Sequence, residues 1–299
     1  MENNCDYVSS RGILKSCDIY SANPNSSISQ LTHYDFSKCK QGSIIYICST
    51  ALYKFKNILP LLPCKIILIT GDADQTCWKD LFETQDDFLT FIESEKIIHW
   101  FSQNCTAVHP KITQIPIGMD YHTMSKHYPK WGPKLLPLEQ EQILKTIPKQ
   151  PFWKRIIKGY SNFHFFTNTK YGYDRINAIK CLPANTVYYE PSHLLRESSW
   201  LNQSKYAFVI SPHGNGLDCH RTWEALLLGC IPIVKTSELD PLYTELPVLI
   251  VKDWSEVNLT LLHDTIDHFR PMTFNYSKLL LSYWVNIIQQ YVPVHNLLK

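Results

Sequence analysis

The stretch SPHGNGLDCHRTWEALLLGCIPIV, residues 211–234, holds the residue types best suited to bind a phosphate-bearing ligand. Backbone N–H groups at the start of a helix, opened here by Gly214 and Gly216, favour an anion through both their geometry and the helix dipole. His213 and Arg221 would add hydrogen-bond donors to a diphosphate. The segment therefore predicts an anion site, although its spacing alone leaves an ordinary strand-to-helix turn as an equal alternative.

The second half of this stretch predicts a helix with one packing face and one polar face. We expect it to span 218–230, with Asp218 as the N-cap. Its apolar side chains cluster on one side, and Arg221 and Glu224 fall roughly opposite. Glu224 would then accept hydrogen bonds from ribose hydroxyls, or form only an exposed i, i+3 ion pair with Arg221.

The same turn comes close to the dinucleotide-binding fingerprint G-x-G-x-x-G, because it reads G-N-G-L-D-C. Cys219 stands in place of the third glycine, where helix and strand should approach closely. No acidic residue ends the strand expected at 231–234. A nicotinamide cofactor is therefore disfavoured.

Two carboxylates follow the β-rich run KIILIT in the segment TGDADQ, residues 70–75. Asp72 and Asp74 form the D-x-D pattern that can hold a divalent cation. A carboxylate at this place would also suit a general base that deprotonates a hydroxyl. The remaining alternative is an N-cap for a helix that begins near Gln75.

A second pair of polar residues follows the run ITQIPIG, in the segment IPIGMDYH at 115–122. Asp120 and His122 would line the same cleft as the first pair, as a base or as groups that bind an acceptor. A simple turn explains them nearly as well.

A fourth candidate segment is NTKYGYDRINAI, residues 168–179. Lys170 and Arg175 could approach a diphosphate from there. A solvated first helical turn is the commoner explanation for such residues.

The elements expected around these residues alternate between short β-rich runs and helical stretches, which is typical of parallel sheets. In the first part we expect a helix within 75–94 and strands at 43–48, 65–70, 96–101 and 112–118. In the second part we expect strands at 163–167, 186–189, 206–211, 231–234 and 247–251.

This alternation predicts an α/β protein with two Rossmann-like lobes, at 1–125 and 155–274. A proline-rich interdomain region at 126–154 separates the lobes, and an apolar stripe predicts a terminal helix within 275–299. Ligands of such sheets bind beyond the carboxyl ends of the strands, so we expect the candidate residues to meet in a central cleft.

The composition narrows the class of protein. Hydrophobic residues make up 44% of the 299 and charged residues 19%, as in ordinary globular proteins. A net charge of +2 without a basic stripe argues against nucleic acid as a partner. The sequence shows neither a signal peptide nor an apolar run of membrane-spanning length, so we expect a cytoplasmic protein whose ten cysteines are reduced thiols. The histidines and cysteines show no motif with the spacing of a metal-binding site.

The segment from Tyr206 to Val251 resembles the C-terminal nucleotide-sugar-binding module of exostosin-like glycosyltransferases. The shared features are a strand, a P-x-G turn, an R-x-x-E-A-L helix and a G-C-I-P-V strand. The upstream IIHWFSQNC…HPKITQIPIGMDYHT is similar to the N-terminal lobe of compact, soluble members, including some encoded by large DNA viruses. The resemblance is specific over about 204–255, extends to 96–123 and is thin elsewhere.

This resemblance implies a GT-B fold, a UDP-sugar donor held mainly by the C-terminal lobe, no further cofactor, and metal-independent transfer, usually with inversion. Arg221 would contact the diphosphate and Glu224 the ribose. The turn that connects the strand at 206–211 to the helix would be formed by Gly214, Asn215, Gly216 and Asp218. His213 stands where an arginine is common, and no membrane anchor like that of eukaryotic members is recognised.

Within such a fold an inverting enzyme needs a base on the N-terminal lobe, and Asp72, Asp74 and Asp120 are the candidates. We expect the acceptor to be a glycan hydroxyl and favour a pentose donor such as UDP-xylose. Two other functions stay open. One is a non-catalytic protein that binds nucleotide sugars, and the other is a metal-dependent glycosyltransferase that uses Asp72 and Asp74 as ligands.

Overall fold

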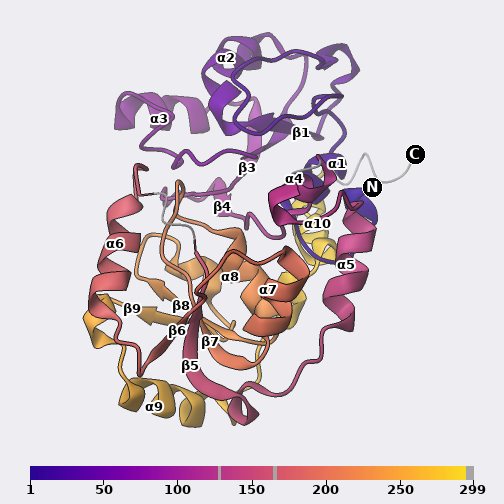
Figure 1. Ribbon diagram of the computed structural model, residues 1–299. Helices are drawn as coiled ribbons and strands as arrows, with labels where there is room; N and C mark the ends of the chain where they lie inside the picture. The colour runs from indigo at the N-terminus through magenta and orange to yellow at the C-terminus, as the bar shows by residue number, and fades with distance from the viewer. Residues whose placement is uncertain (127–128, 164–166, 294–299) are drawn as a thin grey trace.

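The computed structural model describes residues 1–126, 129–163 and 167–293, which form two α/β lobes stacked one above the other (Figure 1). The N-terminal sheet has the order β1-β2-β3-β4, and all its pairings are parallel. Its strands are β1 (Ser43–Cys48), β2 (Ile66–Gly71), β3 (Ile97–Ser102) and β4 (Ile112–Gln114). Three of these are runs of isoleucine and other large apolar residues that are buried on both faces, as parallel strands require.

The helices of the N-terminal lobe are shorter than the sequence predicts. They are α1 (Ser10–Lys15), α2 (Leu52–Ile58), α3 (Gln85–Ile92) and α4 (Tyr121–Ser125). The helix expected within 75–94 begins only at Gln85, where Thr84 and Asp87 form a capping box, and the residues before it form turns. The strand expected at 112–118 ends at Gln114, because the chain then turns toward the N-terminal segment and Gly118 pairs with Ser9.

The C-terminal sheet has the order β6-β5-β7-β8-β9 and is also fully parallel. Its strands are β5 (Ile156–Ser161), β6 (Val187–Tyr189), β7 (Tyr206–Ile210), β8 (Ile231–Lys235) and β9 (Leu249–Val251). The prediction of a strand at 163–167 is wrong. Phe163 and Thr167 lie outside strands, and 164–166 fall outside the described residues. The strand lies earlier, at Ile156–Ser161, where Gly159 allows Ile210 of β7 to pack closely.

Helices α6 (Gly172–Cys181), α7 (Arg196–Gln203), α8 (His220–Leu227) and α9 (Leu259–Phe269) surround the C-terminal sheet. The expected N-cap of α8 is wrong. Cys219 holds that position, because the carboxylate of Asp218 accepts hydrogen bonds from Ile117 N and Trp223 Nε1 instead.

Two further helices join the lobes. Helix α5 (Pro137–Thr146) lies within the region expected to connect the domains. Helix α10 (Leu281–Gln289) lies within the expected terminal helix and returns to the N-terminal lobe, where it packs on α1 (Figure 1). Short 3₁₀ helices occur at Glu2–Asn4, Phe36–Lys38, Ser49–Ala51, Leu59–Leu61, Pro129–Trp131, Phe152–Lys154, Asp240–Tyr243, Trp254–Glu256 and Tyr276–Leu279.

The core that lies between the lobes contains residues of both sheets and of the terminal helix. Phe101 of β3, Trp223 of α8 and Trp284 of α10 belong to one apolar cluster. The outer face of each sheet has a cluster of its own. The two lobes are therefore packed on each other rather than joined only by a linker.

Two Rossmann-like lobes with parallel sheets, which meet at the carboxyl ends of their strands, form the GT-B arrangement, so the expected fold class is confirmed. In the C-terminal sheet the strand order reverses between β5 and β7, which places a binding crevice beside the turn after β7. Among the described residues, none of the helices has the length and apolar character needed to span a membrane.

Candidate functional site

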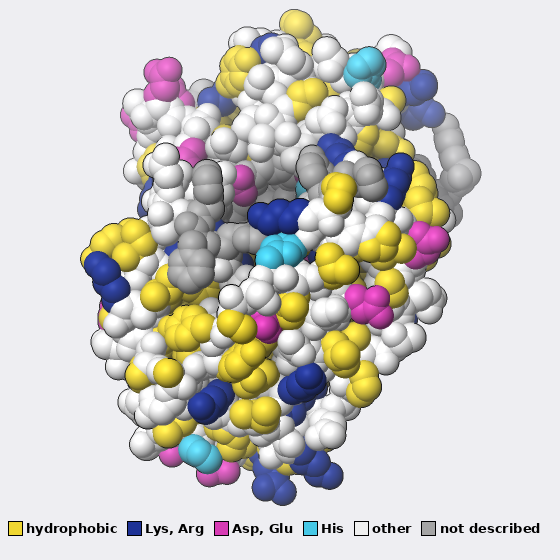
Figure 2. Space-filling view, viewed as in Figure 1, with side chains coloured by type: hydrophobic (Ala, Val, Ile, Leu, Met, Phe, Trp, Pro, Cys, Tyr) yellow, Lys and Arg dark blue, Asp and Glu magenta, His cyan; other side chains and the backbone are white. Residues whose placement is uncertain are grey.

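A cleft of about 330 Å³ lies between the lobes at the carboxyl ends of the strands. Figure 2 shows this hollow, with basic and histidine side chains beside it. The sequence-predicted residues that line it come from both lobes and are Asp74, Asp120, Arg175, Gly214, Asn215, Gly216, Asp218, Arg221 and Glu224. The structure thus brings most of the candidate residues to one place.

Arg221, in the first turn of α8, is the most unusual cation of the cleft. Its Nη1 atom is buried and has no hydrogen-bond partner within the described residues. Its guanidinium lies 5.5 Å from the ring centre of Phe163, and burial lowers the pKa of Arg221. A guanidinium stays protonated even so, and a buried donor without a partner costs free energy. The site is therefore prepared for an anion that would accept from Nη1.

A second guanidinium approaches the same turn from α6. Arg175 Nε donates to the backbone oxygen of His213 at 3.2 Å. A Cβ atom placed on Gly214 would lie 2.6 Å from Arg175 Nη2, so the glycine is what allows this close approach. No side chain caps α8, whose first residues line the cleft together with the glycine turn. The guanidiniums of Arg175 and Arg221 and the N-terminus of α8 therefore surround one part of the cleft.

Glu224 is held in place by two residues of α7. Its Oε2 accepts from Trp200 Nε1 at 3.1 Å, and its Oε1 lies 3.9 Å from Arg196 Nη1. One turn separates Glu224 from Arg221, so it lies farther along the same wall of the cleft. A fixed carboxylate at that position can accept from the hydroxyls of a bound ligand.

Arg196 is a residue of this site that the sequence analysis missed. Its Nη2 lies 3.0 Å from Asp120 Oδ2, and its Nη1 donates to the backbone oxygen of Asp120. Arg196 looks in the sequence like any polar residue in the first turn of a helix. No local signal reveals it, because its partner lies in the other lobe.

Asp120 is the N-cap of α4, and its carboxylate lies close to several hydrogen-bond donors. Its Oδ1 accepts from Thr123 N at 3.1 Å and lies 3.0 Å from His122 Nδ1. Burial alone would raise the pKa of this carboxyl, but the charges of His220, Arg196 and His122 outweigh it and hold the pKa well below its usual range. Asp120 is therefore ionised and paired with Arg196, which makes it a poor acceptor for a proton.

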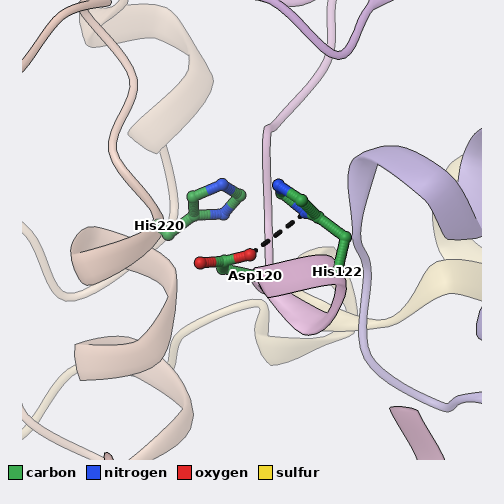
Figure 3. Close-up of side chains that lie close together, drawn as sticks. All are labelled: Asp120, His122 and His220. Carbon is green, nitrogen blue, oxygen red and sulfur yellow. Dashed lines mark ion pairs between the residues drawn. The ribbon is translucent and has the colours of Figure 1, made fainter. Parts of the chain in front are cut away.

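Two histidines flank Asp120, one from each lobe (Figure 3). His122 follows it in α4, and His220 begins α8. His220 Nδ1 lies 2.6 Å from the carbonyl oxygen of Gly118, so this nitrogen carries the proton. Gly118 has a φ of 64°, and a side chain there would collide with the backbone of Val8. The glycine thus sets the turn that brings these groups together.

The spacing of these three side chains is compatible with a metal ion, since one ligand atom from each lies within 4.8 Å of the others. Asp120, however, already forms bonds with Arg196, His122 and Thr123 N. A guanidinium 3.0 Å from the carboxylate would oppose a second cation at the same place. The cluster is better suited to exchange a proton than to bind a metal.

Asp72 and Asp74 do not form a shared pair of ligands. Asp72 is buried, accepts from Ser26 Oγ at 2.8 Å, and lies 3.5 Å from Arg11 Nε. Asp74 reaches the main cleft and accepts from Asn215 Nδ2 at 2.6 Å, a contact between the lobes. The ion pair with Arg11 makes Asp72 unsuitable as a base, and Asp74 stays a candidate.

Two predicted contacts to the diphosphate are not supported by the positions of the side chains. His213 Nδ1 lies 3.5 Å from Asp174 Oδ2, and His213 is not among the described residues that line the main cleft. Lys170 Nζ lies 2.6 Å from Asp80 Oδ1 in the other lobe. Each of the two side chains already has a carboxylate partner, which the local sequence could not reveal.

Asp218 lies at the contact between the lobes rather than at a helix cap. Its Oδ2 accepts from Ile117 N and its Oδ1 from Trp223 Nε1, both at 2.8 Å. Its own N–H donates to Asn104 Oδ1 at 2.8 Å. Burial raises the pKa of Asp218 to about 6. Asp218 thus holds the glycine turn against the N-terminal lobe.

No family model and no curated protein matches this chain. Solved structures that resemble it include the apo structure of OtsA, at 12% sequence identity, with 86% of this chain and 74% of that chain covered and a TM-score of 0.43. A second is described as trehalose-6-phosphate from E. coli bound with UDP-2-fluoro glucose, at 10% identity, with 85% and 71% covered and a TM-score of 0.36. Ligand and reaction are therefore inferred from the residues of this chain.

Proposed function

We propose that this protein is a UDP-sugar-dependent glycosyltransferase that transfers a sugar to a hydroxyl of a glycan acceptor. The observation that carries the proposal is the buried Nη1 of Arg221, without a partner among the described residues, in a cleft between two Rossmann-like lobes. Such a donor at the start of a helix fits a diphosphate. Arg175 lies near enough to add a second charge on the same turn.

In the proposed complex the diphosphate binds Arg221, Arg175 and the start of α8, and Glu224 accepts from the ribose. The sugar then extends toward Asp120 and His220, which also line the cleft. An acceptor from the N-terminal lobe would attack the face of the sugar opposite the diphosphate, so the proposed transfer is inverting. UDP-xylose is the first donor to test, followed by hexose donors.

Transfer without a metal ion is part of the proposal. The departing UDP would be stabilised by the guanidiniums and by the N–H groups of α8, which act at the place where negative charge develops. The metal-dependent alternative would use Asp72 and Asp74. It is less favoured, because Asp72 lies in an ion pair with Arg11 and lines only a smaller cavity.

Titration calorimetry with UDP tests the donor site. Replacing Arg221 by methionine removes a charged hydrogen bond of about 2 kcal/mol, so we expect UDP to bind roughly thirtyfold more weakly. Arg270→Met is the matched control, because Arg270 is an exposed arginine of the same lobe beside Trp153. Equal affinities for UDP in the wild type and Arg221→Met would contradict the proposed donor site.

Release of UDP from a panel of UDP-sugars, with and without EDTA, tests the reaction. A glycosyltransferase of the proposed kind releases UDP slowly into water and faster with an acceptor, and EDTA leaves both rates unchanged. Binding of UDP-sugars without any release under these conditions would favour the alternative, a protein that binds nucleotide sugars and does no chemistry. Loss of UDP release in EDTA would favour the metal-dependent enzyme.

A further inference from the structure

A second, smaller cavity of about 150 Å³ lies on the N-terminal side of the main cleft. Its lining includes the hydroxyl and carboxylate side chains of Ser10, Ser26, Asp72 and Asp74. His122 also lines this cavity, and His220 lines both cavities. A compound bound in the smaller cavity would therefore meet the two imidazoles before it reached the main cleft.

The hydrogen bonds of His122 determine which of its nitrogens can react. Nδ1 lies 3.0 Å from Oδ1 of Asp120, which is ionised, so Nδ1 carries a proton and donates it to the carboxylate. The other ring nitrogen, Nε2, has no hydrogen-bond partner among the described residues. A neutral imidazole in this state presents a lone pair at Nε2, the arrangement by which a carboxylate prepares a histidine to accept a proton.

We propose that His122, oriented by Asp120, takes the proton from the acceptor hydroxyl, and that the acceptor is a neutral polyhydroxyl compound bound in the smaller cavity. The proposal rests on the proposed function. The O–H bond breaks as the proton moves to Nε2, and the oxygen forms a bond to the anomeric carbon. The bond from that carbon to the diphosphate oxygen breaks, and its electron pair leaves with UDP toward Arg221.

His122 fits this role better than the three aspartates expected from the sequence. Asp72 is paired with Arg11, and Asp120 is paired with Arg196. Asp74 lies in reach of the cleft, but its Oδ2 already accepts from Asn215 Nδ2. An imidazole, by contrast, has an ordinary pKa near the pH at which enzymes work.

His122 also fits better than His220. The Nδ1 of His220 donates to the neutral carbonyl of Gly118, whereas that of His122 donates to a carboxylate. The negative charge of Asp120 stabilises the imidazolium that forms when His122 takes a proton. The ring centres of the two histidines are 5.9 Å apart, so a proton on one disfavours a proton on the other. One proton acceptor is therefore expected at this cluster.

The charges that face His122 come from four residues. Burial, the largest influence, lowers its pKa. Asp120 and Asp72 raise the pKa, and His220 and Arg11 lower it. The pKa of His122 therefore lies below its ordinary value, and the imidazole is neutral at neutral pH. The carboxylates of Asp72 and Asp74 would repel an anionic acceptor, which is why the proposal specifies a neutral one.

The test measures UDP affinity by calorimetry and UDP release between pH 5 and 9. For His122→Gln we expect a Kd for UDP within twofold of the wild type and turnover lower by roughly 10²- to 10⁴-fold. The wild type should lose activity as the pH falls through the pKa of His122, and the variant should not show that loss. His109→Gln, which changes an imidazole paired with Glu93 at the surface, is the control and should match the wild type.

The Asp120→Asn variant distinguishes an effect of Asp120 on the charge of His122 from an effect of Asp120 on packing. It removes the negative charge that supports the imidazolium, so the acid limb of the pH profile should move to lower pH, together with a lower turnover and retained UDP affinity. A merely structural role would lower turnover without moving this limb. Methyl glycosides of neutral sugars should raise UDP release, and glucuronic acid should not.

Three results would overturn the inference. Turnover of His122→Gln equal to that of the wild type excludes the imidazole as the proton acceptor. Loss of wild-type turnover in EDTA with recovery in Zn²⁺ would mean that the cluster binds a metal instead. Preference for glucuronic acid excludes a neutral acceptor. If the wild type neither binds UDP nor releases it from any donor, the proposed function itself fails, which is a different outcome from these three.

Discussion

Arg196 of α7 forms an ion pair with Asp120 of the other lobe, with 3.0 Å between Nη2 and Oδ2. Their side chains are only 9% and 14% exposed. The same guanidinium lies 3.9 Å from Glu224, so one cation holds a carboxylate on each side of the cleft. This pair links the contact between the lobes to the residues that would act on a ligand.

Replacement of Arg196 by methionine should destabilise the protein. The change leaves Asp120 buried without its main cation, and such a loss costs about 3–5 kcal/mol. Urea unfolding would measure it, with Arg270→Met as a surface control expected to change stability by less than about 0.5 kcal/mol. Adding Asp120→Asn to Arg196→Met should recover part of the loss. A double variant no more stable than the single one would argue against the ion pair as the cause.

The buried carboxyl of Asp218 should make stability depend on pH. Burial raises its pKa to about 6, above the ordinary value near 4, so the folded state holds a proton that the unfolded state has already lost. The contribution of Asp218 to stability therefore falls as the pH rises from about 4 to 6 and is constant above that.

Asp218→Asn tests this dependence, since asparagine does not titrate. The free energy of unfolding of the variant, minus that of the wild type, should rise by about 2.4 kcal/mol between pH 4 and pH 7. The difference between proteins is the quantity to measure. Burial lowers the pKa of His99 to about 4, so His99 contributes the opposite trend to both proteins. A difference that does not change with pH would show that Asp218 is ionised throughout.

Gly214→Ala should weaken UDP binding without preventing folding. The new methyl group would lie 2.6 Å from Arg175 Nη2, and a flexible side chain moves more easily than backbone. Displacing the guanidinium from the turn costs a charged hydrogen bond, so we expect roughly tenfold weaker binding in calorimetry. Circular dichroism should show an unchanged fold. Wild-type affinity in this variant would mean that Arg175 does not contact the diphosphate.

Lys170→Met should leave UDP affinity within twofold of the wild type. Lys170 Nζ lies 2.6 Å from Asp80, and the two side chains are 45% and 27% exposed. A pair this exposed contributes about 0–1 kcal/mol to stability, so the loss in urea unfolding should be equally small. A large loss of UDP affinity would instead support the contact with a diphosphate that the sequence predicts for Lys170.

Several elements could be predicted from the sequence because their signals are local. Strands β1, β2 and β3 are dense runs of isoleucine between turns, and a buried parallel strand requires that composition. The same holds for β7 and β8, so the two α/β lobes were expected correctly. Strand β5 was misplaced because Lys158 and Gly159 interrupt its apolar run, and the phenylalanines after it looked more like a strand.

The sequence also indicated which turns carry functional groups, since chemistry in such sheets lies after the strands. It identified Gly214, Arg221 and Glu224 on one cleft wall and Asp120 with His122 on the other. These residues lie in the turn or the helix that follows each strand, so a local pattern was enough to place them at the right edge of the sheet.

Only the tertiary structure decided the charge and bonding state of each group. Lys170 is paired with Asp80, Asp72 with Arg11, and Asp120 with Arg196, the last across 76 positions of the chain. Whether a carboxylate can take a proton or a cation can bind a phosphate depends on what lies within a few ångströms of it. That neighbourhood arises from packing between the lobes and cannot be recognised in the local sequence. The proton acceptor that we propose is therefore His122 rather than one of the aspartates.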